Sequence, residues 1–125
     1  MQAVKTEKAP LPIGPYSQAV RAGDFLFISG QVGVNPKTKR IVNGGIEAQT
    51  RQTLQNVGAI LDAAGLSFEK VVKVTVFLAD MKDFRKMNDV YGTYFKTYAP
   101  ARTTVQAQLP VADAVVEIDA IAHSP

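Results

Sequence analysis

The chain has 125 residues, of which 46% are hydrophobic and 20% are charged, a balance typical of a globular protein. It has no cysteine, which excludes disulfides, zinc–thiolate centres and thiol nucleophiles, and its single histidine, His123, argues against a histidine-based catalytic triad. The net charge of +3 is too small to indicate nucleic-acid binding by itself. By length, residues 1–125 are expected to form one domain.

The beginning of the chain predicts no targeting segment. Residues 1–10 are polar, and no apolar run reaches the length of a signal-peptide core or of a membrane span. We therefore expect a cytoplasmic protein without a membrane partner.

Two strands joined by a hairpin are predicted first. Residues 9–15 hold three prolines and a glycine, which favour an ordered turn. Residues 16–21 are typical of a short strand, residues 22–24 of a hairpin turn, and residues 25–32 of a stronger strand. In the stronger strand one face is apolar, with Leu26 and Ile28, and the other carries Phe25, Phe27, Ser29 and Gln31.

A loop and a long helix are predicted next. Residues 35–45 have the composition of a loop. Apolar residues within 46–64 recur at helical spacing, which predicts an amphipathic helix. Gly65 is suited to end this helix in the left-handed conformation.

A further strand and a second helix follow. Residues 71–78 alternate as a strand whose apolar face would carry Val72, Val74, Val76 and Leu78. Asp80 or Asp83 can cap the second helix, which would run through Phe84, Met87 and Tyr91 to Tyr94 or Phe95.

The last quarter of the chain carries two more predicted strands. In the first, which extends to Leu109, polar and apolar residues alternate, and Arg102 falls on the polar side with Thr104, Gln106 and Gln108. The second, residues 115–122, is almost continuously apolar, which favours a central strand covered on both faces. Its carboxylates Glu117 and Asp119 are costly to bury without a partner. Arg102 is the nearest candidate, so we expect an arginine and a glutamate on one face of the sheet.

The predicted order of elements is β-β-α-β-α-β-β, which favours two helices on one side of a sheet. The opposite side would then be mixed in character, with Phe25, Phe27 and Phe77 beside the polar residues Ser29, Gln31, Lys73, Thr75, Thr104, Gln106, Glu117 and Asp119. A face that is both polar and aromatic suits a subunit interface that contains sites. We therefore expect a homo-oligomer.

Five segments in order resemble the RidA family, also called YjgF or L-PSP proteins. They are IGPYSQA at 13–19, ISGQ at 28–31, the helix at 49–65, VKVTVFLADMKDFRKMN at 72–88, and PAR at 100–102 together with EIDAIA at 117–122. The resemblance covers nearly the whole chain. It implies an α+β fold of the chorismate-mutase-like kind, in which a mixed β-sheet has two helices on one face. It further implies a homotrimer whose clefts lie between subunits.

The resemblance implies a 2-iminobutanoate/2-iminopropanoate deaminase, which hydrolyses reactive imino or enamino acids to 2-keto acids and ammonia. Arg102 would hold the substrate carboxylate with its planar fork, and Glu117 would orient or activate the attacking water. Tyr16 would hydrogen-bond substrate or water. The remaining binding positions would be Ser29, Gly30, Phe84, Asn88 and Thr104. The reaction needs no cofactor, and we expect no metal.

One position departs from the family pattern, because many members carry cysteine where this chain has Thr104. We expect activity to survive, since the carboxylate clamp and the water do not depend on a thiol. Two alternatives remain: an endoribonuclease or translation inhibitor, and a non-catalytic trimer that binds small carboxylates. The sequence has no histidine pair and no basic stripe with interleaved aromatics, so nucleic acid is not an expected partner.

Overall fold

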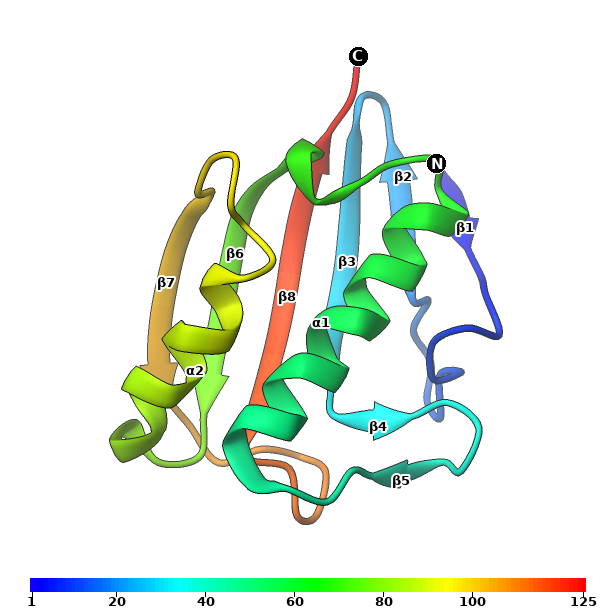
Figure 1. Ribbon diagram of the computed structural model, residues 1–125. Helices are drawn as coiled ribbons and strands as arrows, with labels where there is room; N and C mark the ends of the chain where they lie inside the picture. The colour runs from blue at the N-terminus through cyan, green and yellow to red at the C-terminus, as the bar shows by residue number, and fades with distance from the viewer.

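The structure is a computed structural model that describes residues 1–125, and its framework is a six-stranded sheet in the order β1-β2-β3-β8-β6-β7. Both helices, α1 (Gly45–Ala63) and α2 (Phe84–Gly92), lie on one face of this sheet (Figure 1). The strands are β1 (Gln2–Val4), β2 (Ala19–Ala22), β3 (Phe25–Val32), β6 (Val71–Leu78), β7 (Ala101–Gln106) and β8 (Val116–His123). The predicted mixed α+β sheet is confirmed.

Strand β8 lies in the middle of the sheet, as its apolar sequence predicted. It pairs antiparallel with β3 on one side and with β6 on the other, and β6 pairs parallel with β7 at the edge. The β6-α2-β7 unit is the expected strand–helix–strand crossover. The side chains of Val116, Ile118, Ala120 and Ala122 are buried under the helices, whereas Glu117, Asp119 and Ile121 lie on the opposite, open face.

Two irregularities correct the predicted faces of β3 and β6. The pairing of β3 with β8 shifts between Ile28 and Gln31, so Gln31 is only 5% exposed and lies on the helix-covered side. The pairing of β6 shifts between Val71 and Lys73, so Val71 is buried and Val72 is 40% exposed. A bulge adds one residue to a strand, and every side chain beyond it then changes face.

Several boundaries differ from the predicted ones. The second helix ends at Gly92, because Tyr94 and Phe95 turn back to pack on Phe68, a residue of the short helix η1 (Phe68–Lys70). Strand β2 begins at Ala19, not at residue 16, and β7 ends at Gln106.

Some elements were not predicted. These are β1, the short helices η1 and η2 (Met81–Asp83), and a two-stranded ribbon of β4 (Val34–Asn35) and β5 (Arg40–Ile41) inside the expected loop. Asp80 caps η2 by accepting a hydrogen bond from the Lys82 amide at 2.9 Å. His123 is the last residue of β8 and contacts the Phe25 ring, rather than lying in a solvated tail. Neither α1 nor α2 has the length and hydrophobicity needed to cross a membrane.

Helix α1 ends as the sequence predicted, at a glycine with a left-handed backbone. Gly65 has φ +76°, and its amide donates to the Asp62 carbonyl at 2.9 Å. The Leu66 amide donates to the Leu61 carbonyl at 2.8 Å. These two bonds form the Schellman motif, which satisfies carbonyls that the end of a helix would otherwise leave free.

We predict that Gly65→Ala lowers the free energy of unfolding by about 1–2 kcal/mol, because a Cβ disfavours the left-handed conformation. The space around Gly65 is open, so no clash adds to this cost. Gly92→Ala is the matched control, since Gly92 also has open space but no positive φ. Urea unfolding should separate the two variants, and equal midpoints would contradict the prediction.

Candidate active site

The eight residues predicted to form the site fall into two separate groups. Tyr16, Ser29, Gly30 and Glu117 line one cleft of about 360 Å³, together with Pro10, Gln31, Val32, Pro110 and Val111. We call this the carboxylate cleft. Arg102 and Thr104 on β7 and Phe84 and Asn88 on α2 form the second group, to which the structure adds Tyr91. We call these five residues the guanidinium cluster.

The Glu117 side chain extends from β8 over the neighbouring strand β3 into the carboxylate cleft. Gly30 on β3 leaves the space that it occupies. A Cβ placed on Gly30 would lie 2.3 Å from Oε2 of Glu117, closer than atoms of this kind can approach. Glu117 pairs with Val32 on β3 and with Phe77 on β6, so the central position of β8 fixes where its carboxylate begins. The absence of a side chain at Gly30 is therefore a requirement of the cleft.

Ser29 fixes the segment that carries Tyr16. Its hydroxyl donates to the Ser17 carbonyl at 2.6 Å, and its amide donates to the Gln18 carbonyl at 2.9 Å. Gln18 is 1% exposed and its amide donates to the carbonyl of Pro10 at 2.8 Å. Tyr16 itself is 50% exposed at the rim of the cleft. Ser29 thus has a structural partner, and its hydroxyl proton is already used within the chain.

The pKa of Glu117 is raised above its ordinary value, first because the carboxyl is partly buried and second because Asp119 places a negative charge nearby. Asp119 lies two residues further along the same face of β8. Both effects favour the protonated form, so this carboxyl exchanges its proton closer to neutral pH than an exposed glutamate does. A group of this kind is suited to accept and return a proton.

The guanidinium cluster forms because α2 packs over the edge strand β7 (Figure 1). Phe84, Asn88 and Tyr91 are spaced four and three residues apart, so they share one face of α2. Arg102 and Thr104 are two residues apart on β7 and pair with Val74 and Val76, whose side chains are buried. They therefore face the helices.

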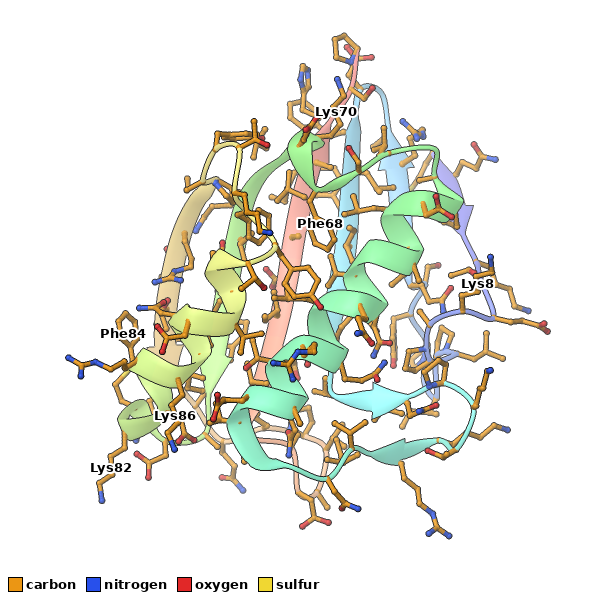
Figure 2. The ribbon with its side chains drawn as sticks, viewed as in Figure 1. Lys8, Phe68, Lys70, Lys82, Phe84 and Lys86 are labelled. Carbon is orange, nitrogen blue, oxygen red and sulfur yellow. The ribbon has the colours of Figure 1, made fainter.

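The Arg102 guanidinium lies over two aromatic rings. Its central carbon lies 4.8 Å from the centre of the Tyr91 ring and 5.6 Å from that of Phe84. Figure 2 shows Phe84 projecting from the first turn of α2. Aromatic faces attract the cation without using its N–H groups, which stay available for a ligand. Arg21 differs, because it donates to the Ala64 carbonyl at 2.7 Å and has a structural role.

Three buried polar atoms of the cluster have no hydrogen-bond partner in the chain. They are Oδ1 of Asn88, the hydroxyl of Tyr91 and Oγ1 of Thr104. Leaving a buried polar atom unpaired costs about 1–3 kcal/mol, so such atoms are few in native structures. Two of them, the oxygens of Asn88 and Thr104, are suited to contact a polar ligand bound by Arg102. Tyr91 was predicted as part of the helix's apolar stripe, although its spacing from Phe84 and Asn88 already put it on their face.

The two groups do not meet within one chain. The prediction that Arg102 and Glu117 share one face of the sheet is wrong. Glu117 pairs with Phe77, which lies beside Val105 on β7, and all three side chains point to the open face. Arg102 lies three residues before Val105 and points to the helix side. From strand spacings, the Cα atoms of Arg102 and Glu117 are about 14 Å apart. Thr104 and Gln106, also predicted on the open face, lie on the helix side for the same reason.

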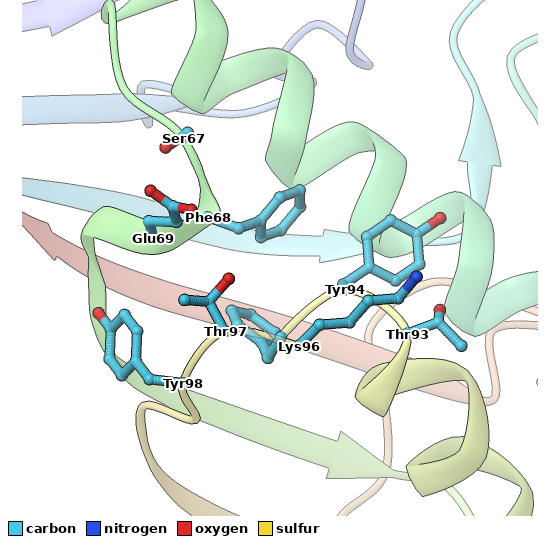
Figure 3. Close-up of a pocket in the computed structure, with 9 residues that line it drawn as sticks. Ser67, Phe68, Glu69, Thr93, Tyr94, Lys96, Thr97 and Tyr98 are labelled. Carbon is cyan, nitrogen blue, oxygen red and sulfur yellow. The ribbon is translucent and has the colours of Figure 1, made fainter.

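A separate hollow of about 460 Å³ lies between η1 and the segment that follows α2 (Figure 3). Its lining consists of Ser67, Phe68, Glu69 and residues 93–98, and includes none of the predicted site residues. The Phe68 ring contacts the rings of Tyr94 and Phe95 here. No three His, Asp or Glu side chains anywhere in the structure lie close enough together to hold a metal ion.

Comparison with known proteins places the chain among close relatives. Residues 6–124 match the family model described as Endoribonuclease L-PSP. A RutC family protein of Pyrococcus horikoshii is 55% identical over 122 residues, 98% of this chain and 97% of the relative. The 2-iminobutanoate/2-iminopropanoate deaminase of Mus musculus is 48% identical, covering 97% of this chain and 90% of that protein. The crystal structure of E. coli TdcF with bound serine matches with a TM-score of 0.94 and 41% identity over the whole of both chains.

We predict that Asp119→Asn lowers the pKa of Glu117, because it removes a negative charge that opposes ionisation. Burial still acts on the carboxyl, so part of the rise should remain. The Glu117 carboxyl carbon can be followed by NMR through a pH titration. Asp62→Asn, at an exposed position on α1, is the control and should leave the midpoint unchanged. A Glu117 midpoint that Asp119→Asn does not move would contradict the role given to Asp119.

Proposed function

The chain belongs to the endoribonuclease L-PSP family, which includes the RidA proteins, and from this premise we propose that it hydrolyses 2-imino acids in clefts shared between subunits. The products would be 2-keto acids and ammonia. The observation that carries the proposal is the division of the site into two incomplete halves. One half offers an arginine with free N–H groups, and the other offers a carboxyl with a raised pKa.

A homotrimer would bring these halves together. The open face carries exposed apolar side chains, with Phe25 43%, Phe27 45% and Val105 39% exposed, and a partner chain would cover them. Closed rotational symmetry repeats one contact around a ring. In such a ring the guanidinium cluster of one subunit would lie beside the carboxylate cleft of the next.

The proposed reaction begins with the substrate carboxylate on the Arg102 guanidinium, joined by two parallel hydrogen bonds. A water molecule then adds to the imine carbon, and Glu117 accepts one of its protons. Glu117 returns this proton to the nitrogen, which gives an intermediate with one hydroxyl and one amino group on the same carbon. Glu117 then accepts the hydroxyl proton and passes it to the amino group, so the C–N bond breaks, ammonia leaves and the C=O bond forms. In total one water is consumed, and one 2-keto acid and one ammonia are released.

The other site residues take smaller roles in the proposal. Gly30 leaves space for the Glu117 carboxylate, and Ser29 fixes the segment of Tyr16. Tyr16 is exposed enough to donate a hydrogen bond to substrate or water. Asn88 and Thr104 offer unpaired polar atoms to the bound molecule. Phe84 packs against the guanidinium and borders the place of the substrate side chain.

Two relatives support this reading. The mouse protein is named for deamination of 2-iminobutanoate and 2-iminopropanoate, and it matches this chain over nearly its full length. TdcF is described with bound serine, a small molecule with an α-carboxylate like that of an imino acid. The free fork of Arg102 suits such a carboxylate.

A carboxylate-binding trimer without catalysis is the alternative that the guanidinium cluster alone would support. The two functions differ at Glu117, which a binding protein does not need and a hydrolase does. Loss of turnover with retained binding in Glu117→Gln would favour catalysis, whereas binding without turnover in the intact protein would favour the alternative.

We predict that the intact protein accelerates the loss of 2-iminopropanoate formed in situ by an amino-acid oxidase. Glu117→Gln should reduce the rate by about 10²–10⁴, the usual contribution of general base catalysis. Arg102→Lys should reduce it by at least about tenfold, because lysine keeps the charge and loses the planar fork. Arg85→Ala, exposed on α2, is the control and should be fully active. The proposal fails if the intact protein does not accelerate the reaction.

Gly30→Ala should nearly abolish activity while the protein stays folded. The new Cβ would displace the Glu117 carboxylate, and the flexible end of that side chain can move without disturbing the core. Gly14→Ala is the matched control, since its Cβ would make only an ordinary contact of 3.5 Å with the Tyr16 ring. Activity and urea unfolding are measured together. Full activity in Gly30→Ala would show that the position of the carboxylate does not matter.

A further inference from the structure

Tyr91 occupies an unusual place for a core aromatic residue. It is 6% exposed in the last turn of α2, and its ring lies 4.8 Å from the central carbon of the Arg102 guanidinium. Tyr91 also contacts the first of two neighbouring aromatic rings that connect it to η1. Phe95 lies 4.6 Å from Tyr91, and Phe68 meets Phe95 edge-on at 5.4 Å. Figure 3 shows Phe68 projecting from the segment before β6 in the direction of Tyr94. The rings of Phe68, Phe95 and Tyr91 run from η1 to the guanidinium and leave the Tyr91 ring little freedom.

Arg102 needs such support because of where it lies. It projects from the edge strand β7 on a long side chain, which loses rotamer freedom when it is fixed. An arginine that is already oriented in the folded protein loses this rotamer freedom on folding and not on binding. It therefore binds its ligand more tightly. An acidic partner would orient it too, but would neutralise the charge that attracts a carboxylate. A neutral ring orients the guanidinium and leaves both its charge and its N–H groups for the ligand.

The phenol of Tyr91 remains neutral beside this cation. Burial raises its pKa, and the positive charge of Arg102 offsets only part of the rise. Phe84 is less suited to the same task, because its ring is 5.6 Å from the guanidinium and 37% exposed at the first residue of α2.

We propose that Tyr91 is a positioning residue, whose ring holds the Arg102 guanidinium in the orientation that binds the substrate carboxylate. This inference rests on the proposed function of the same site. It assigns the effect to the ring, so the hydroxyl is dispensable for binding. Removing the hydroxyl also removes a buried polar atom that has no partner.

The test compares Tyr91→Phe, which keeps the ring, with Tyr91→Leu and Tyr91→Met, which replace it with aliphatic side chains. Methionine fills space flexibly, so it serves if leucine prevents folding. Binding of 2-oxobutanoate, a stable 2-keto acid, is measured by calorimetry on the full-length protein. Tyr91→Phe should bind within about twofold of the intact protein, and the aliphatic variants about tenfold more weakly. In the imine assay KM should rise by a similar factor with kcat little changed, because carboxylate binding is uniform through the reaction.

An NMR measurement tests the contact between Tyr91 and Arg102 directly and does not depend on ligand binding. The Arg102 Nε–H proton should be shifted upfield by the Tyr91 ring in the intact protein, and this shift should vanish in Tyr91→Met.

A merely structural role predicts that Tyr91→Met, once folded, binds 2-oxobutanoate as tightly as Tyr91→Phe, and that result would overturn the inference. If the intact protein binds no 2-oxobutanoate, the proposed function fails and this inference with it. Binding retained in all variants overturns the role of Tyr91 alone.

Discussion

Arg102 and Glu117 lie on opposite faces of one sheet, two strands apart, and the rest of the site is arranged around this separation. No rotation of side chains can bring them to one small ligand, because the sheet itself lies between them. Each residue instead has its own supporting group. Aromatic rings from α2 hold the arginine, and a glycine on β3 admits the glutamate. In the proposed function, these two half-sites on different faces form one site where two copies of the chain meet.

Three of the five buried side-chain oxygens without a hydrogen-bond partner lie in the guanidinium cluster, and the other two are the hydroxyls of Thr50 and Thr53 on α1. Asn88, Tyr91 and Thr104 each carry a buried oxygen without a partner, at a cost to stability. The core between β8, β6 and α1 is mainly apolar, and Leu54, Ile60, Val76 and Ile118 within it are at most 1% exposed. This packing offsets the cost. Under the proposed function, the unpaired oxygens of Asn88 and Thr104 and the Glu117 carboxyl with its raised pKa are the groups that meet a ligand.

Much of this arrangement could be predicted from the sequence, and the errors have a common physical cause. The central position of β8, the Schellman end of α1 at Gly65 and the helix-covered side of the sheet all follow from local pattern. The face of β7 does not, because the rule that apolar residues point inward is reversed there. Arg102 and Thr104 point toward α2, and Val105 points outward with 39% exposure. On β7 the polar side chains face the helices and the apolar Val105 lies on the open face, which is the reverse of the usual alternation. The bulges that move Gln31 and Val72 leave equally little trace in a pattern of period two.

The central claim is that one catalytic site takes Arg102 from one chain and Glu117 from another, and subunit mixing tests it most directly. Arg102→Ala and Glu117→Gln proteins are each inactive in this account, and equal amounts are unfolded and refolded together. In randomly mixed trimers about a quarter of the clefts would then pair an intact arginine with an intact glutamate, so activity should recover toward about a quarter of the intact value. If both residues acted from the same chain, the mixture would be as inactive as its two parents, and that result would contradict the account.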